Sequence, residues 1–422
     1  MASRALIDIG PLRQSRDFRL LFAGQMVSMV GNQFTMVAIA FQVYSLTRSS
    51  LQVGAVSLAQ LGPLVLGAII GGALGDSTDR RRVLLAASAM LGLTSGALAL
   101  NATFSHPSVL AIYLVSAVAA GFGGVVSTVC AAAVPSLVKG EQLTAAYASM
   151  QVVDQVGMVV GPALSGLVIG ALGLRWAFGA DVATFVFSTA NVVAMSTLPP
   201  EPGAKSPRLS SIVEGFRYIA GRQLLLGVYL IDLNATVLGL PTALFPALAR
   251  SVFHGGPSVL GYMYASPAAG ALVGALTTAW LKRVRRRAWG VTAAVSVWGG
   301  VIVAFGFVHV LWAALCLLAL AGWADVISAV LRDTVLQTSV DEAFRSRVTS
   351  VQMAVVEGGP RLGALESGAI ATAVSTQFSV VSGGIACIAG ALVLTALMPA
   401  FRHQGRRHRS SDDPSGTTPG EG

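Results

Sequence analysis

Charged residues are scarce in this chain of 422 residues, because Lys, Arg, Asp and Glu together make up only 11% of it. An average soluble domain contains about 25% of such residues. Here 54% of the residues are hydrophobic, and the mean hydropathy is +0.71. This composition excludes an ordinary soluble domain. Cysteine is also scarce, and Cys130, Cys316 and Cys387 all lie in apolar runs, so neither a disulfide framework nor a metal site is expected.

Two signals of other functions are missing. No segment has the form Gly-x4-Gly-Lys-Ser/Thr, so we expect no ATP hydrolysis through a phosphate-binding loop. The N-terminus is polar up to Arg19 and lacks a cleavage pattern, so we expect no cleaved signal peptide. We therefore expect neither an enzyme nor a cofactor. Energy would have to come from an ion gradient, a substrate gradient or another subunit.

Long apolar runs are what the chain has instead, and each run of 18 or more residues is a candidate membrane span. The runs are continuous and do not alternate in ten-residue segments, which predicts helices and not a barrel. The sequence thus predicts an all-α membrane protein with twelve transmembrane helices. The predicted spans are roughly 19–45, 51–74, 83–103, 108–134, 146–173, 175–197, 222–248, 257–280, 288–308, 310–336, 347–373 and 377–400.

Lys and Arg are distributed unevenly between the two predicted sides of the membrane. Most of the 28 fall in the N-terminus, the C-terminus and the even-numbered loops. Arg332 lies near the cytoplasmic end of the tenth span and is counted with that side. Because such residues favour the cytoplasmic side, both termini are predicted to be cytoplasmic. The same bias explains the net charge of +9, so no nucleic-acid partner is needed.

The predicted spans divide six and six around a polar centre. We expect a cytoplasmic N-terminus (1–18), a six-helix bundle (19–198), a cytoplasmic loop (199–221), a second six-helix bundle (222–400) and a disordered cytoplasmic tail (401–422). The two halves resemble each other: Arg80–Arg82 matches Arg285–Arg287, and Glu141, Ser149 and Gln151 match Glu342, Ser350 and Gln352. Such matches at a nearly constant offset indicate two parallel repeats.

Two motifs resemble signatures of the major facilitator superfamily. The loop Gly72-x-Leu74-Gly75-Asp76-Ser77-Thr78-Asp79-Arg80-Arg81 is similar to the superfamily's Gly-x-Leu-Ala-Asp-Arg-x-Gly-Arg-Arg/Lys, and departs from it at Ser77 and Asp79. The fifth span contains Gly157-x-x-x-Gly161-Pro162-x-x-Ser165-Gly166, which resembles the antiporter signature of exporters. Simple close packing of helices is the alternative interpretation of the second motif.

Further segments resemble the branch of the superfamily that contains the enterobactin exporters and multidrug efflux proteins. They are Arg16–Gln25, Leu110–Leu114 and Phe245–Ala249. The resemblance implies a bacterial inner-membrane exporter of siderophores or drug-like molecules, driven by the proton gradient. Cys130 and Ala131 stand where this branch often has an arginine, which weakens the transfer of substrate identity.

Acids inside spans are the candidates for proton coupling, because removal from water favours the neutral carboxyl form and a charge change alters helix packing. We assign this role to Asp154, Asp232 and Glu357, with a structural hydrogen-bonding role as the alternative. Asp181 and Asp333 lie toward the ends of their spans, and we expect them to be structural or interfacial.

The candidate substrate-binding residues are polar groups in otherwise apolar helices: Gln25, Ser28, Asn32, Asn234, Arg361 and Glu366. The first three form one stripe at spacings of three and four, for which hydrogen bonding between helices is the alternative role. Arg361 follows Glu357 by four residues, so the two can form an ion pair. Gly358–Pro360 between them is expected to weaken the helix.

A gate is implied by the resemblance, and we assign Asp76, Arg80, Arg81, Gly157, Gly161 and Pro162 to it. In the superfamily, the acid of the loop signature is implied to dock near the start of the eleventh helix when the cytoplasmic side is closed. In this chain that helix is expected to begin near Arg347, where the helix dipole is positive.

The sequence therefore predicts a proton-coupled secondary exporter of a siderophore or similar amphiphilic small molecule, working by alternating access. We expect a monomer with no partner besides its substrate and the lipid bilayer. Broad multidrug efflux is one alternative, and a non-transporting receptor or regulator is another. The intramembrane acids argue against a non-transporting protein, because each of them costs about 2.5–3.5 kcal/mol at the bilayer centre.

Overall fold

The computed structural model describes residues 10–200, 209–284, 287–341 and 344–398, and these are almost entirely helical. The first half contains α1 (Gly10–Gln14), α2 (Arg16–Thr47), α3 (Ser50–Ser77), α4 (Arg80–Asn101), α5 (Val109–Leu137), η1 (Gly140–Gln142), α6 (Leu143–Leu172) and α7 (Leu174–Val193). A short helix, α8 (Leu209–Ala220), follows. The second half contains α9 (Gln223–Leu238), η2 (Thr242–Leu244), α10 (Phe245–Ser251), α11 (Pro257–Thr277), η3 (Thr278–Arg283), α12 (Arg287–Phe305), α13 (Leu311–Ser339), α14 (Arg345–Ala373) and α15 (Thr376–Leu397).

Eleven of the described segments are long and apolar enough to cross a membrane, and the stretch from α9 to α10 counts as one of them. Among the long helices of the described residues, α14 lies outside this set. It is as long as α5 and α13, but Glu357, Arg361 and Glu366 make it more polar. The predicted class, an α-helical protein with many spans, is confirmed, and the expected twelfth span corresponds to α14.

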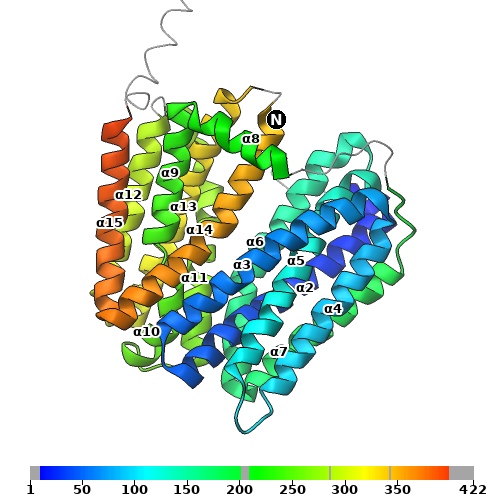
Figure 1. Cartoon of the computed structure of the whole chain (residues 1–422), viewed down its shortest axis with the longest axis horizontal. Coiled ribbons are helices and arrows are strands. Elements are labelled where there is room, and N and C mark those ends of the chain that lie inside the picture. The colour runs from blue at the N-terminus through cyan, green and yellow to red at the C-terminus, as the bar shows by residue number, and fades with distance from the viewer. Residues whose placement is uncertain (1–9, 201–208, 285–286, 342–343, 399–422) are drawn as a thin grey trace, which may run out of the picture.

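The helices form two bundles, α2–α7 and α9–α15, that lean against each other (Figure 1). We call the face that carries α1 and α8 the linker face, and the face that carries α10 the distal face. The linker face is the one predicted to be cytoplasmic. In Figure 1 the bundles meet toward the distal face and splay apart toward the linker face.

Glycines set the two lines of contact between the bundles. In the first line, α3 packs on α14, and a Cβ added at Gly54 would overlap the carbonyl of Ala364. In the second, α6 packs on α11, and a Cβ at Gly166 would lie 2.9 Å from the Cα of Gly261. Small residues allow helix backbones to approach this closely. Both lines use the distal parts of their helices, so the bundles meet in a pseudo-symmetric way.

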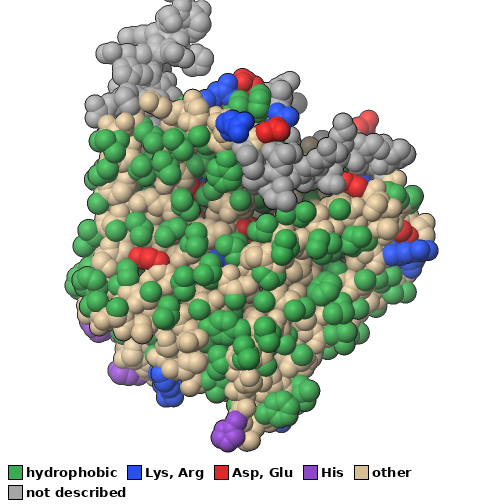
Figure 2. Space-filling view, viewed as in Figure 1, with side chains coloured by type: hydrophobic (Ala, Val, Ile, Leu, Met, Phe, Trp, Pro, Cys, Tyr) green, Lys and Arg blue, Asp and Glu red, His purple; other side chains and the backbone are tan. Residues whose placement is uncertain are grey.

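Hydrophobic side chains cover the middle of the molecule, and charged ones gather mainly near the two faces (Figure 2). Leu93, Leu276 and Trp312 are among the most exposed apolar side chains, at 65%, 79% and 74%. Such a belt would be unfavourable in water and suits a lipid environment.

The helix between the bundles, α8, is attached to the second bundle. Glu214 forms an ion pair with Arg347 at 3.0 Å, and Arg222 forms one with Asp341 at 2.8 Å. The ring of Tyr218 also stacks on the ring of Phe344, with 4.2 Å between centroids. These contacts hold α8 beside the start of α14.

Candidate functional site

An ion pair lies on α14 where this helix leaves its contact with α3. Nη1 of Arg361 lies 2.7 Å from Oε2 of Glu357, as the spacing of four residues predicted. A Cβ added at Gly358, the residue after Glu357, would lie 4.0 Å from the side chain of Leu61 on α3. On the linker side of this point, Met353 is exposed. The pair therefore lies at the vertex between the two bundles, and its side chains remain 23% and 49% exposed.

The helix carrying this pair is not broken. We expected Gly358–Pro360 to weaken it, but α14 runs continuously from Arg345 to Ala373 with Pro360 inside. The glycines serve close packing instead. A Cβ at Gly359 would overlap the hydroxyl of Thr236 on α9, and one at Gly363 would overlap the backbone carbonyl of the same residue. Contact with α9 thus supports the helix across the proline.

A second ion pair is buried inside the second bundle. Nη1 of Arg332, on α13, donates to Oδ1 of Asp232, on α9, and the two side chains are only 9% and 4% exposed. Arg332 was counted with the charges of the cytoplasmic side, but α13 continues for seven more residues, to Ser339, so Arg332 lies well inside the helix. Two charges buried among apolar helices need each other, since an unpaired one would be costly.

More acids than bases surround this pair. Asp333 accepts a hydrogen bond from Nε2 of Gln352 at 2.8 Å, which ties α13 to α14. Asp325 lies seven residues before Arg332 on the same face of α13, and its carboxylate has no hydrogen-bond partner within the described part of the chain. Nε of Arg332 is likewise buried without a partner there. We call Asp232, Asp325, Arg332, Asp333 and Gln352 the buried charge cluster. The sequence prediction included Asp232 but missed the partner, Arg332.

Asp154 occupies a position on α6 similar to that of Glu357 on α14. It is exposed, it lies on the linker side of the contact with α11, and no described residue bonds to its side chain. Gly157 and Gly161 pack on α2, where added Cβ atoms would lie 2.5 Å from side-chain atoms of Met29 and Gln33 respectively. Pro162 packs on α11 through its carbonyl, which a Cβ at Gly261 would overlap. The fifth-span motif thus builds the contacts of α6, while its predicted gating role stays a prediction.

Of the three residues in the polar stripe of α2 (Gln25, Ser28 and Asn32), two form hydrogen bonds within the bundle and one is exposed. Gln25 donates to Sγ of Cys130 on α5 at 2.9 Å, and the hydroxyl of Ser28 donates to the backbone of Gln25 at 3.3 Å. Asn32 is exposed, and its amide has no partner among the described residues. Asn32 is thus the member of the stripe with side-chain groups available to a ligand.

The other candidate substrate residues are less alike than the sequence suggested. The amide of Asn234 donates to the carbonyl of Cys387 at 2.8 Å, and so faces α15 of its own bundle. Glu366 is half-buried on α14, next to Leu365, which lies against Gly54. Arg361 is held by Glu357. The structure therefore brings Glu357 and Arg361 together at the vertex and places Asn234 within the helix packing.

Asp181 shows what a structural acid looks like in this protein. Its carboxylate is buried in the first bundle, and it accepts hydrogen bonds of 2.6 Å from Thr35 on α2 and from Ser95 on α4. Thr184 on the same helix is a third donor. All three donors are neutral hydroxyls, which fits the expected structural role.

The loop after α3 is fixed within the first bundle. Asp79 caps α4, and its carboxylate also accepts from the backbone N–H of Leu198 at 3.0 Å. Nε of Arg80 donates to the carbonyl of Gly75 at 3.2 Å, and Nε of Arg81 donates to that of Val192 at 3.1 Å. The docking of Asp76 on α14 concerns a state with the linker face closed, so it stays a prediction.

Bacterial exporters are among the sequence relatives of this chain. Residues 7–413 match the family described as transmembrane secretion effector, within the major facilitator superfamily. The enterobactin exporter EntS of Escherichia coli K12 is 29% identical over 400 residues, which cover 94% of this chain and 95% of that protein. EntS of Citrobacter koseri is 30% identical over 399 residues, with the same coverage.

Solved structures agree on the fold. The nucleoside transporter NupG superposes with a TM-score of 0.71 at 11% identity, over 93% of this chain and 99% of that one. A bacterial homologue of the iron transporter ferroportin, in an inward-facing state, gives a TM-score of 0.68 at 16% identity, over 93% and 99%. One conclusion follows from the two splayed six-helix bundles, the apolar outer surface, the charges buried inside the second bundle, and these matches. The chain is a multi-span membrane transporter that belongs to the transmembrane secretion effector family of the major facilitator superfamily.

Proposed function

We propose that this protein exports a siderophore or a similar amphiphilic small molecule across the bacterial inner membrane, in exchange for protons and by alternating access. Both termini would lie in the cytoplasm. The observation that carries the cargo class is the similarity to enterobactin exporters, which spans 94% of this chain and 95% of the relative. No partner other than the cargo and the lipid bilayer is required, and a monomer contains all the proposed elements.

The arrangement of the bundles supports alternating access. They meet along α3–α14 and α6–α11 toward the distal face and splay apart toward the linker face. If the linker face is cytoplasmic, this is the form that would take up cargo from inside the cell. Glu357 and Arg361 at the vertex, and the exposed amide of Asn32 on α2, are the polar groups that would meet the cargo first.

The buried charge cluster supports proton coupling. A proton on Asp232 would remove its negative charge, and with it the attraction that joins α9 to α13. Arg332 would then be free to turn toward Asp325, which lies on its own helix face. A proton would thus change which helices are joined, and coupling requires such a change. Asp154 and Glu357 are the other candidate proton carriers, because both acids are exposed on the linker side of the bundle contacts.

Transport in liposomes tests the proposal. The purified protein is reconstituted, enterobactin is added outside, and the interior is made acidic relative to the exterior. Molecules inserted with the linker face outward should accumulate enterobactin inside, and a protonophore should abolish this accumulation. Equal accumulation without the pH gradient would exclude proton coupling. No accumulation under any gradient would exclude this cargo.

A second cargo separates the proposed function from broad multidrug efflux. Ethidium, a cationic drug-like dye, is offered in the same vesicles under the same gradient. A siderophore exporter should leave it outside. Comparable accumulation of both compounds would favour the multidrug alternative, since the protein would then transport two chemically unrelated compounds.

A further inference from the structure

A cavity of about 360 Å³ opens at the distal face, between the two bundles and far from the vertex site. Its walls are the end of α2, from the first bundle, and α10 with the start of α11, from the second. The residues used below are Phe41, Tyr44, Arg250, His254 and Leu260. The volume lies within the range of small-molecule sites, about 300–1,000 Å³.

The charge of the cavity is positive. Arg250 and His254 line it, and its lining contains no Asp or Glu. The Arg250 side chain is exposed, and no described residue forms an ion pair or hydrogen bond with it. A guanidinium without a partner can bind a carboxylate through two parallel hydrogen bonds. The cavity therefore suits an anion.

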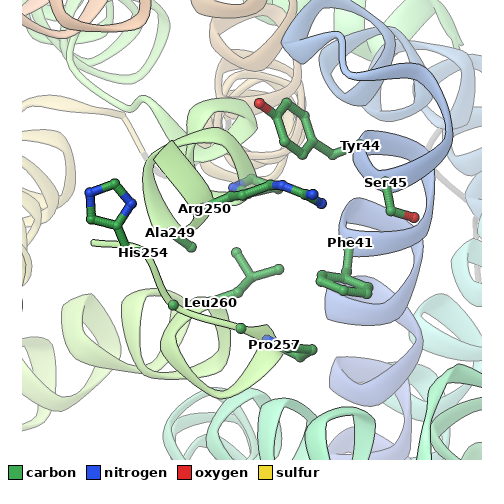
Figure 3. Close-up of a pocket in the computed structure, with 11 residues that line it drawn as sticks. Phe41, Tyr44, Ser45, Ala249, Arg250, His254, Pro257 and Leu260 are labelled. Carbon is green, nitrogen blue, oxygen red and sulfur yellow. The ribbon is translucent and has the colours of Figure 1, made fainter. Parts of the chain in front are cut away.

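Aromatic rings flank the cation. Phe41 and Tyr44 are three residues apart on α2, so they share one face of that helix. Figure 3 shows the Arg250 side chain extending from α10 toward α2, with its end between the Tyr44 and Phe41 side chains. Leu260 adds an apolar wall from α11. A flat apolar ring that carries an anionic group would match both the rings and the cation.

The segment that carries Arg250 is firmly held. Phe245 and Leu248 of α10 are buried, and the ring of Phe245 meets that of Tyr264 edge to face, with 5.1 Å between centroids. The loop that follows is closed by a hydrogen bond of 2.8 Å from the N–H of Gly255 to the carbonyl of Ala249. His254 has a φ of 48°, a left-handed backbone conformation that is costly for a residue with a side chain. Such a conformation persists only where its surroundings enforce it.

We propose that this distal cavity is a binding site for a small planar aromatic carboxylate, with the carboxylate on Arg250 and the ring between Phe41 and Tyr44. The site is separate from the vertex and the buried charge cluster. Binding here does not require that the protein export a siderophore or exchange protons. Because the walls come from both bundles, the ligand would contact both at once.

Direct binding to the purified protein tests the site. The probe is 1-naphthoate, titrated while its fluorescence anisotropy is measured, and the matched neutral probe is 1-naphthamide. Wild-type protein should bind the carboxylate at least tenfold more tightly than the amide. Equal affinity for the two probes, or no binding of the carboxylate at millimolar concentration, would overturn the proposal.

Two arginine variants locate the binding. Arg250→Gln should weaken 1-naphthoate binding at least tenfold, and because the side chain is exposed the variant should fold as wild type does. Arg175→Gln is the matched control, because Arg175 is also exposed and lies near an aromatic ring, that of Trp176 at 5.7 Å, but does not line the cavity. Its affinity should equal that of wild type. Unchanged binding in Arg250→Gln would place the ligand elsewhere.

Phe41→Leu and Tyr44→Leu then test the rings. Each substitution should weaken the binding of 1-naphthoate. Acetate has no ring, so its weak binding should be the same in wild type and in both variants. Full affinity in both variants would show that the rings do not take part, and the proposed pose would be wrong.

Discussion

Each bundle buries an acid, and the two acids are held in different ways. Asp181 in the first bundle accepts from the hydroxyls of Thr35 and Ser95, and neither of these donors carries a charge. Asp232 in the second bundle is bound to the guanidinium of Arg332. Hydroxyl donors can still bond to a carboxyl group after it takes up a proton, because each hydroxyl can also accept. An arginine can still donate to the remaining acceptor oxygen of a neutral carboxyl group, but it cannot accept from the new O–H and it keeps its charge, so the ionic attraction is lost.

The difference indicates where a proton would have a mechanical effect. Protonation of Asp181 would rearrange hydrogen bonds among α2, α4 and α7, which would stay joined. Protonation of Asp232 would deprive Arg332 of its partner on α9, and α9 and α13 would lose the ion pair between them. The second bundle therefore contains the pair that a proton can break, and the first bundle contains a fixed tie.

The largest expected effect comes from breaking this pair. Asp232→Asn should lower stability by about 3–5 kcal/mol, because it leaves Arg332 charged and without its partner. Thermal unfolding in detergent measures this loss. Asp232→Asn with Arg332→Gln should recover much of the stability, since neither charge then remains, but should not recover gradient-driven transport.

Asp181→Asn is the control for that comparison. It should cost about 1–3 kcal/mol through its imperfect hydrogen bonds, while the ratio of transport with and without a pH gradient stays that of wild type. If Asp232→Asn also kept the wild-type ratio, the buried charge cluster would not couple protons. If Asp181→Asn lost it, the contrast between the bundles would be wrong.

A smaller effect is expected at the contact between the bundles. Gly54→Ala places a Cβ against the carbonyl of Ala364, so α3 and α14 must move apart at the distal end. We expect a loss of about 1–3 kcal/mol, as for other overpacked sites, measured by thermal unfolding. Gly62→Ala, on the same helix, has open space around the new Cβ and should be neutral or stabilising. Equal stability of the two variants would show that α3 and α14 can move apart here without loss of stability.

Local patterns were sufficient for part of the site. Long apolar runs predicted the spanning helices, and the spacing of four residues predicted the ion pair between Glu357 and Arg361. Pairing between distant residues was not predictable in this way. Arg332 and Asp232 are 100 residues apart, and the sequence showed Arg332 only as a positive charge near the cytoplasmic end of its span.

Helix rotation was the other missing information. A membrane helix faces lipid on one side and protein on the other, and both are apolar, so hydrophobic periodicity does not show which side faces inward. Asn234 was therefore assigned to a binding role, although its amide bonds to α15. The glycines near Pro360 were interpreted as a weak point for the same reason, because the sequence does not show α9 lying against them.

The smallest expected effect concerns α8, which contrasts with the fixed loop of the first bundle. Glu214 holds Arg347 near the start of α14, and because both side chains are partly exposed this pair contributes less than about 1 kcal/mol. Glu214→Gln should therefore leave thermal stability almost unchanged.

If Asp76 docks near the start of α14 when the linker face closes, the same variant should favour closure, because Arg347 is released from α8. Fluorescence energy transfer between dyes at Ser77→Cys and Thr338→Cys, in a background without the native cysteines, should then report a shorter distance. Arg217→Gln, which alters an exposed cation on the same helix, should not change the distance. A Glu214→Gln variant with the wild-type distance would show that α8 does not compete with the loop of the first bundle.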